Sequence, residues 1–66
     1  MKIKELEALE STFIYPGDIA ELLECDAQDI RDMAKQGTLP FEHVRIGSTT
    51  KIYRQAFIRR WKELTQ

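Results

Sequence analysis

The apolar positions in the first part of the chain repeat with the period of short helices. Apolar side chains recur at intervals of three near the N-terminus, at Ile3, Leu6 and Leu9. This spacing predicts a short helix within Met1–Glu10. A second helix is predicted over Pro16–Leu23, because proline suits the first position of a helix. Between these helices, three successive apolar residues favour an extended segment over Thr12–Tyr15, which is a candidate third strand beside a hairpin.

A third helix is predicted over Ala27–Gln36, since Asp26 is a good N-cap and Gly37 is a good C-terminal stop. Together with the helix over Pro16–Leu23, it forms a helix-turn-helix. Apolar residues stand where the two helices would touch, at Ile19, Leu23, Cys25, Ile30 and Met33. The turn position that usually holds glycine is occupied by Glu24, where a positive φ would cost about 1 kcal/mol.

The second half of the chain predicts a β-hairpin followed by one more helix. Val44 and Ile46 alternate with polar residues, which predicts a half-buried strand with its apolar side toward the core. Residues 47–50 would form the hairpin tip, and the returning strand would direct Ile52 to the core. Over Gln55–Leu64 the apolar residues recur with helical spacing, which predicts a final helix packed on the core. Its apolar stripe consists of Phe57, Trp61 and Leu64, with Ile58 beside it.

These elements predict a mainly α fold with a small β-hairpin. The arrangement is that of a winged helix-turn-helix with three to four helices and a two- to three-stranded wing. The 66 residues suit one domain, in which residues 1–11 form an N-terminal extension or a short helix. A domain of this size has little room for an enclosed substrate pocket.

Composition argues against several classes of function. A single cysteine, Cys25, and a single histidine, His43, provide neither an internal disulfide nor a zinc site. No nucleophile–base set or phosphate loop can be assembled, so we expect no enzyme activity, metal, cofactor or small-molecule substrate. The apolar runs are too short to span a bilayer and the N-terminus is unlike a signal peptide. We therefore expect a cytoplasmic protein with no membrane partner.

Charge is unevenly distributed along the chain. The net charge of −1 is not typical of a phosphate-binding protein. However, residues 1–33 carry nine acidic and three basic side chains, whereas residues 34–66 carry seven basic and two acidic ones. If the halves also separate in space, the C-terminal half would hold DNA and the acidic face would meet solvent or a protein partner.

The outward side of the helix over Ala27–Gln36 is the candidate recognition surface. At 100° per residue, this side carries Gln28, Asp32 and Lys35, with Arg31 beside them. Glutamine can pair with adenine, and arginine or lysine with guanine or phosphate. Asp32 could only accept a hydrogen bond from a cytosine amino group, or it would be repelled. The alternative is a solvated helix in which Asp32 pairs with Lys35 or Gln28.

The hairpin and the final helix supply the remaining candidate DNA contacts. Outward and tip residues of the hairpin are predicted to be Arg45, Ser48, Thr49, Thr50, Lys51 and Arg54. Small hydroxyl side chains suit phosphate and minor-groove contact, although any exposed hairpin tip is polar. On the final helix, the basic residues Arg59, Arg60 and Lys62 could add backbone contacts or cover the aromatic side chains.

These motifs give the chain a family resemblance over roughly residues 13–64. The order IYPGDIAELLECD, DIRDMAKQGTLPF, VRIG, YR and FIRRW resembles the excisionase-type winged helix related to MerR-type regulators. The positions that match the family pattern are Ala20, Leu23, Gly37, Leu39, Pro40, Arg45, Gly47, Arg54 and Trp61. The chain departs from that pattern in lacking the turn glycine and in having an acidic recognition helix.

The resemblance implies a small phage or mobile-element protein of a prokaryotic or phage-infected cell. Such a protein binds double-stranded DNA beside recombination sites, bends it and assists an integrase in excision. Because a lone domain of 66 residues would have modest affinity, we also expect repeated sites, self-association on DNA or a recombinase partner. By position, the major-groove readers would be Gln28, Arg31, Asp32 and Lys35, and the wing would be Arg45, Ser48, Thr49, Thr50 and Lys51. The alternatives are a small transcriptional regulator, a DNA-binding domain like that of a phage terminase small subunit, and an acidic protein-interaction module.

Overall fold

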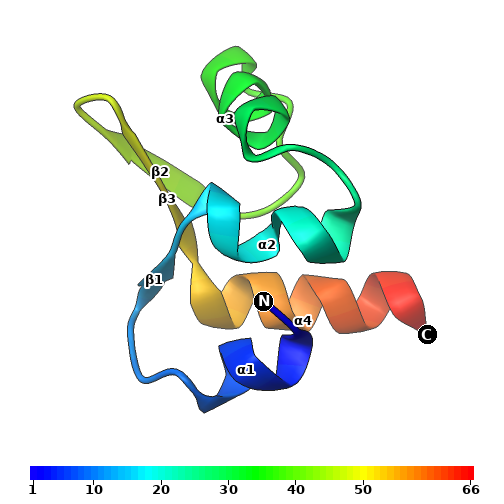
Figure 1. Cartoon of the computed structure of the whole chain (residues 1–66). Coiled ribbons are helices and arrows are strands. Elements are labelled where there is room, and N and C mark those ends of the chain that lie inside the picture. Colours follow the sequence, from blue (N-terminus) through cyan, green and yellow to red (C-terminus); the bar gives the residue numbers. More distant parts are fainter.

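The computed structural model describes residues 1–66 as four helices and a three-stranded antiparallel sheet (Figure 1). In chain order, the elements are α1 (Ile3–Ala8), β1 (Phe13–Ile14), α2 (Pro16–Leu23), α3 (Ala27–Gln36), β2 (His43–Ile46), β3 (Thr49–Tyr53) and α4 (Arg54–Thr65). This mixture of helices and a small hairpin-like sheet is compatible with a winged helix-turn-helix and confirms the predicted fold class. Both α2 and α3 have the predicted bounds. None of the helices combines the length and apolar character that a membrane span requires.

Local signals in the sequence explain where α2 and α3 begin and end. The backbone N–H of Tyr15 donates to the Asp18 carboxylate at 2.8 Å, which satisfies one of the donors at the start of α2. After α2, Glu24 has a left-handed backbone with φ 54°, so the turn carries the strain predicted for it. Asp26 occupies the N-cap position of α3 without a side-chain capping hydrogen bond, and Gly37 ends this helix with φ 77°.

The sheet has the order β1-β3-β2, so the predicted third strand lies at one edge. Ile52 of β3 pairs with Ile14 of β1 on one side and with His43 of β2 on the other. Directly paired residues share a face, and Ile14 and Ile52 are buried, so this inner face is directed to the helices. Val44 and Ile46 therefore point to the outer face. Their predicted core-facing orientation is wrong because the register differs by one residue, which exchanges the two sides of a strand.

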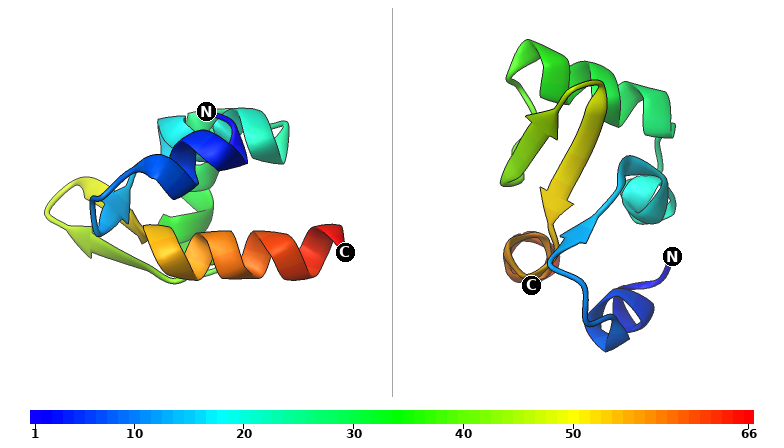
Figure 2. Two further views of the ribbon diagram at one scale, coloured as in Figure 1. Left: turned by 90° about the horizontal axis from the view of Figure 1, so that it is seen from below. Right: turned by 90° about the vertical axis from the view of Figure 1, so that its left-hand side faces the viewer.

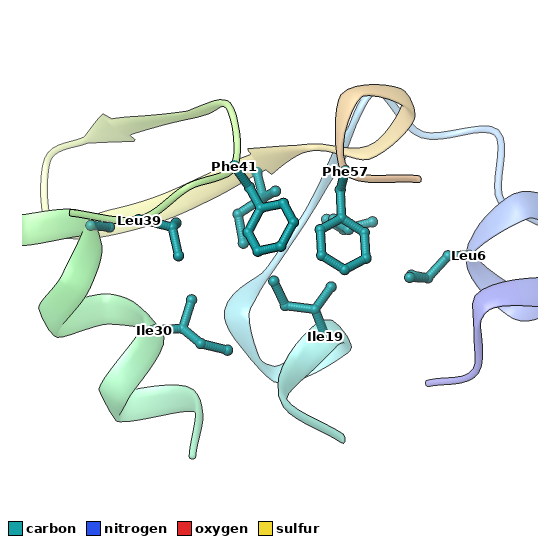
Figure 3. Close-up of a cluster of buried hydrophobic side chains, with 9 residues drawn as sticks. Leu6, Ile19, Ile30, Leu39, Phe41 and Phe57 are labelled. Atoms are coloured by element: carbon teal, nitrogen blue, oxygen red, sulfur yellow. The ribbon is translucent and has the colours of Figure 1, made fainter. Parts of the chain in front are cut away.

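The core lies between the helices and the inner face of the sheet (Figure 3). Its fully buried side chains are Leu6, Ile14, Ile19, Ile30, Ile52 and Phe57. Phe41, from the segment between α3 and β2, packs with its ring centroid 4.7 Å from that of Phe57. Along α4 the burial declines from Phe57 through the half-buried Trp61 to Leu64, which is 55% exposed. The predicted apolar stripe of α4 therefore reaches the core only through its first two turns.

Candidate nucleic-acid interface

The outward side of α3 and the tip of the β2–β3 hairpin lie at the same end of the molecule (Figure 1 and the right-hand view of Figure 2). The helix is held there by the packing of α2 against α3 and by the burial of Ile30 and Ala34. The four residues predicted to meet DNA from this helix are all exposed: Gln28, Arg31, Asp32 and Lys35. The structure therefore places the candidate recognition side chains on one solvent-facing surface.

Hydrogen bonds connect three of these four side chains. The Nε2 amide of Gln28 donates to Asp32 Oδ1 at 3.0 Å, and Nη1 of Arg31 donates to Gln28 Oε1 at 3.4 Å. The pairing of Asp32 with Gln28, considered from the sequence for a solvated helix, is thus present. Gln28 must exchange one of these bonds before its amide can pair bidentately with a base. Lys35 forms no ion pair and takes no part in these hydrogen bonds.

The hairpin tip is shorter than the predicted span of residues 47–50. Gly47 and Ser48 form a two-residue turn, and the flanking strands close with Ile46 opposite Thr49. Gly47 has φ 63°, which fits a type II′ turn with glycine at its first central position. Thr49 therefore begins β3 rather than ending the loop. This tight turn makes the tip narrow, which suits entry into a groove.

Only part of the predicted wing surface is available to a ligand. Arg45, Ser48 and Thr49 are exposed, as predicted, but Arg45 pairs with Thr50 and so lies on the inner face of the sheet and not on the predicted outward face. Thr50 is 5% exposed, so its predicted outward position is wrong. It follows Thr49 at the strand position that alternation turns to the inner face of the sheet. Lys51 is half-buried, with its Nζ 5.5 Å from the centroid of the Phe13 ring, where a cation–π contact holds it against the outer face.

Arg54 is a structural residue and not part of the wing, which corrects the prediction from the sequence. It is the first residue of α4 and is 9% exposed. Its guanidinium donates from Nε to the Ser11 carbonyl at 2.6 Å and from Nη1 to the Leu6 carbonyl at 3.1 Å. Its backbone N–H donates to the Thr12 carbonyl at 3.0 Å. Arg54 therefore fastens the segment after α1 to the start of α4 and compensates the negative end of the α1 dipole.

The basic residues of α4 lie apart from the hairpin tip and largely have partners. α4 runs from the base of the hairpin away from its tip and packs beside α1 (Figure 1). Lys62 Nζ lies 3.8 Å from Glu7 Oε1, and Arg60 Nη1 lies 3.5 Å from Glu63 Oε2. Arg59 is exposed and forms no ion pair. Of these two pairs, only Lys62–Glu7 joins the second half of the chain to the acidic first half.

Neither Cys25 nor His43 belongs to a cluster with metal-binding or nucleophilic geometry. Burial, followed by the nearby Asp29 and Asp26 carboxylates, raises the pKa of the Cys25 thiol. The thiol is therefore a poor nucleophile at neutral pH. His43 Nδ1 lies 2.7 Å from the Phe41 carbonyl oxygen, which fixes the ring beside the start of β2. No group of three or more His, Cys, Asp or Glu side chains could hold a metal ion.

The electrostatics of the α3–hairpin end are mixed. Arg31, Lys35 and Arg45 form no ion pair and remain available to an anion. Asp29 and Asp32 oppose them on the exposed part of α3. No family model, curated protein or solved structure matches this chain.

Proposed function

We propose that this protein binds double-stranded DNA, with α3 in the major groove and the hairpin tip against the neighbouring minor groove or backbone. The observation that supports this proposal is the shared location of the two elements at one end of the molecule. Three cations at this end, Arg31, Lys35 and Arg45, have no carboxylate partner. Unpaired cations on a protruding helix and hairpin suit neutralisation of DNA phosphates.

The roles of the exposed side chains follow from their chemistry. Gln28 can read adenine and Arg31 can read guanine through bidentate hydrogen bonds in the major groove. Lys35 and Arg45 contact phosphates, and the hydroxyl groups of the hairpin tip add hydrogen bonds to the backbone. Asp32 orients Gln28 in the free protein and either accepts from a cytosine amino group or opposes binding.

We further propose that the biological role is that of an excisionase-like recombination accessory factor of a phage or mobile element. The sequence motifs around Gly37, Pro40 and Gly47 support this role. A surface with few free cations gives modest affinity for DNA. A recombinase partner or self-association on repeated sites would supply the additional affinity. A transcriptional regulator or a packaging protein would use the same DNA-binding surface. Only the excisionase-like role requires that excision by an integrase depend on this protein.

Selection of bound sequences from a random DNA pool, followed by affinity measurements across a range of salt concentrations, tests the DNA-binding proposal. We expect enrichment of a sequence motif. We also expect the logarithm of the DNA affinity to fall with the logarithm of the salt concentration, with a slope that corresponds to several neutralised phosphates. Arg31→Ala should relax base preference at one position, whereas Lys35→Ala should weaken all sequences alike and lower the slope by about 1. A flat salt slope with no enriched motif would contradict DNA binding. Co-purification of a basic protein without a nucleic-acid shift would instead support a protein-interaction module.

A further inference from the structure

Ile46 is the most exposed large hydrophobic side chain of the protein. It is 57% exposed, compared with 55% for Leu64, 48% for Tyr15 and 38% for Tyr53. It is the last residue of β2 and lies directly before the Gly47–Ser48 turn. The fold therefore holds an aliphatic side chain in solvent at the protruding end of the hairpin.

The strand register accounts for this exposure. Ile46 lies opposite Thr49, a small exposed residue that covers little of it. Its side chain projects from the outer face of the sheet, because the paired residues Ile52 and His43 define the inner face. No helix lies over the outer face of the hairpin in the right-hand view of Figure 2. Ile46 thus contributes little to the core, and its exposure is not explained by packing.

The charge around Ile46 favours a polyanion as its partner. The hairpin, residues 43–53, contains no acidic residue. Arg45 precedes Ile46 and is exposed without an ion pair, and the glycine, serine and threonine that follow are small. A tip of this composition can approach closely spaced phosphates without repulsion. The large hydrophobic side chain exposed beside these hydroxyl groups is that of Ile46, which is β-branched and therefore has little rotamer freedom to lose.

From these observations, and resting on the proposed DNA-binding function, we propose that Ile46 is a wedge residue. It enters the minor groove with the hairpin tip and inserts between two stacked base pairs, which bends the duplex. Apolar side chains that partly unstack a base step in this way kink DNA by roughly 20–90°. Steps that unstack at low cost, such as TA and CA/TG, are the expected points of insertion, so Ile46 would also contribute indirect sequence preference.

A fluorescent adenine analogue, placed in turn at each adenine position across the selected DNA site, tests the insertion. The analogue brightens when it loses stacking, so the full-length wild-type protein should increase its fluorescence at one or two adjacent positions at the hairpin side of the site. A duplex with donor and acceptor dyes at its ends should report a shorter end-to-end distance. We expect Ile46→Ala to abolish the fluorescence increase and most of the shortening, whereas Ile46→Leu, which keeps an apolar side chain, should retain both.

Leu64→Ala is the matched control, since Leu64 has nearly the same exposure but lies on α4 away from the tip. It should leave unstacking and bending at their wild-type values. Circular dichroism and thermal melting should show Ile46→Ala to be folded, as its side chain is largely outside the core. Wild-type DNA binding without local unstacking, or unchanged unstacking in Ile46→Ala, would overturn the wedge while leaving DNA binding in place. Absence of any DNA binding by the wild type would overturn both proposals.

Discussion

The two ends of this molecule use the same kinds of basic side chain in opposite ways. At the end formed by α3 and the hairpin, Arg31, Lys35 and Arg45 are exposed and without carboxylate partners. At the end formed by α1 and α4, the Arg54 guanidinium is buried on two carbonyl oxygens and Lys62 is paired with Glu7. The difference arises from the elements that carry the residues. α1 packs along α4 and supplies acceptors, whereas no element covers the recognition side of α3.

This contrast shows that the density of basic residues in a sequence does not locate a binding surface by itself. The segment from residue 51 onward contains five of the ten basic residues. Three of these five, Arg54, Arg60 and Lys62, form hydrogen bonds or ion pairs within the protein. The less basic α3 keeps its cations free. Our proposal of DNA contact at the α3–hairpin end therefore rests on the availability of basic side chains there and not on their number.

The largest expected effect is the loss of stability when Arg54 is replaced. Arg54→Ala removes two charge-assisted hydrogen bonds and leaves the buried Leu6 carbonyl without this partner, so the free energy of unfolding should fall by about 3 kcal/mol. Urea denaturation followed by circular dichroism measures this change. Arg54→Lys, which can keep one of the two bonds, should lie between the wild type and Arg54→Ala.

Arg59→Ala is the control for this loss, because an exposed side chain without an ion pair should change stability by less than about 0.5 kcal/mol. One outcome would contradict the structural role of Arg54. If Arg54→Ala were as stable as the wild type but bound DNA more weakly, the residue would belong to the wing after all.

A smaller effect is expected when the free arginine of the hairpin is compared with a paired arginine of α4. Arg45→Ala should weaken DNA binding about fivefold, or about 1 kcal/mol, and reduce the log–log salt slope by about 1, because one phosphate contact is lost. Arg60→Ala carries the same change in net charge but removes a side chain already 3.5 Å from Glu63. Fluorescence anisotropy should show less than a twofold change for Arg60→Ala. Equal losses of DNA affinity in the two variants would mean that the affinity depends only on the net charge of the protein.

The next smaller effect concerns the acidic residue at the centre of the α3 surface. Asp32→Asn keeps an acceptor for Gln28 but removes a charge that repels phosphate, so DNA affinity should rise about twofold at low salt. The gain should shrink as the salt concentration increases. Glu10→Gln makes the same change in charge on the segment after α1 and should have no measurable effect. A loss of affinity for the selected site in Asp32→Asn would show that the carboxylate accepts a hydrogen bond from a cytosine.

Much of the fold was predictable because its signals are local. Pro16 marks the beginning of α2 and Gly37 marks the end of α3, and each signal depends on only a few neighbouring residues. The observed bounds of α2 and α3 therefore match the predicted ones. The strand register was not predictable from the alternation of apolar residues alone. Val44 and Ile46 in one strand, and Ile52 in the other, alternate with polar residues. This alternation does not show which side of the first strand lies on the same face as Ile52. The two-residue Gly47–Ser48 turn pairs Ile46 with Thr49 and therefore His43 with Ile52, which leaves Ile46 in solvent. The prediction missed this signal because it extended the tip over residues 47–50.

The exposure of the candidate site residues was predicted well on α3 and less well on the hairpin. Helical periodicity places Gln28 and Lys35 on the opposite side of α3 from Ile30. Their exposure therefore follows once Ile30 is assigned to the core. Thr50 was misplaced because the tip was predicted to extend to it, whereas β3 begins at Thr49 and its alternation puts Thr50 on the same face as Ile52. Arg54 was misplaced because its acceptors come from the α1 region, more than 40 residues earlier in the chain, and no local pattern records that contact.

The smallest expected effect is the coupling between Lys62 and Glu7, which joins α4 to α1. Their charged atoms lie 3.8 Å apart and the two side chains are 54% and 42% exposed, so solvent screens the pair. A double-mutant cycle with Lys62→Ala and Glu7→Ala should give a coupling energy of at most about 0.5 kcal/mol in urea denaturation, and added salt should reduce it further. DNA affinity should stay within twofold of the wild type in both single variants. A loss of affinity in Lys62→Ala comparable to that of Arg45→Ala would place the α1–α4 end on the DNA as well, because a paired lysine would then have exchanged Glu7 for a phosphate.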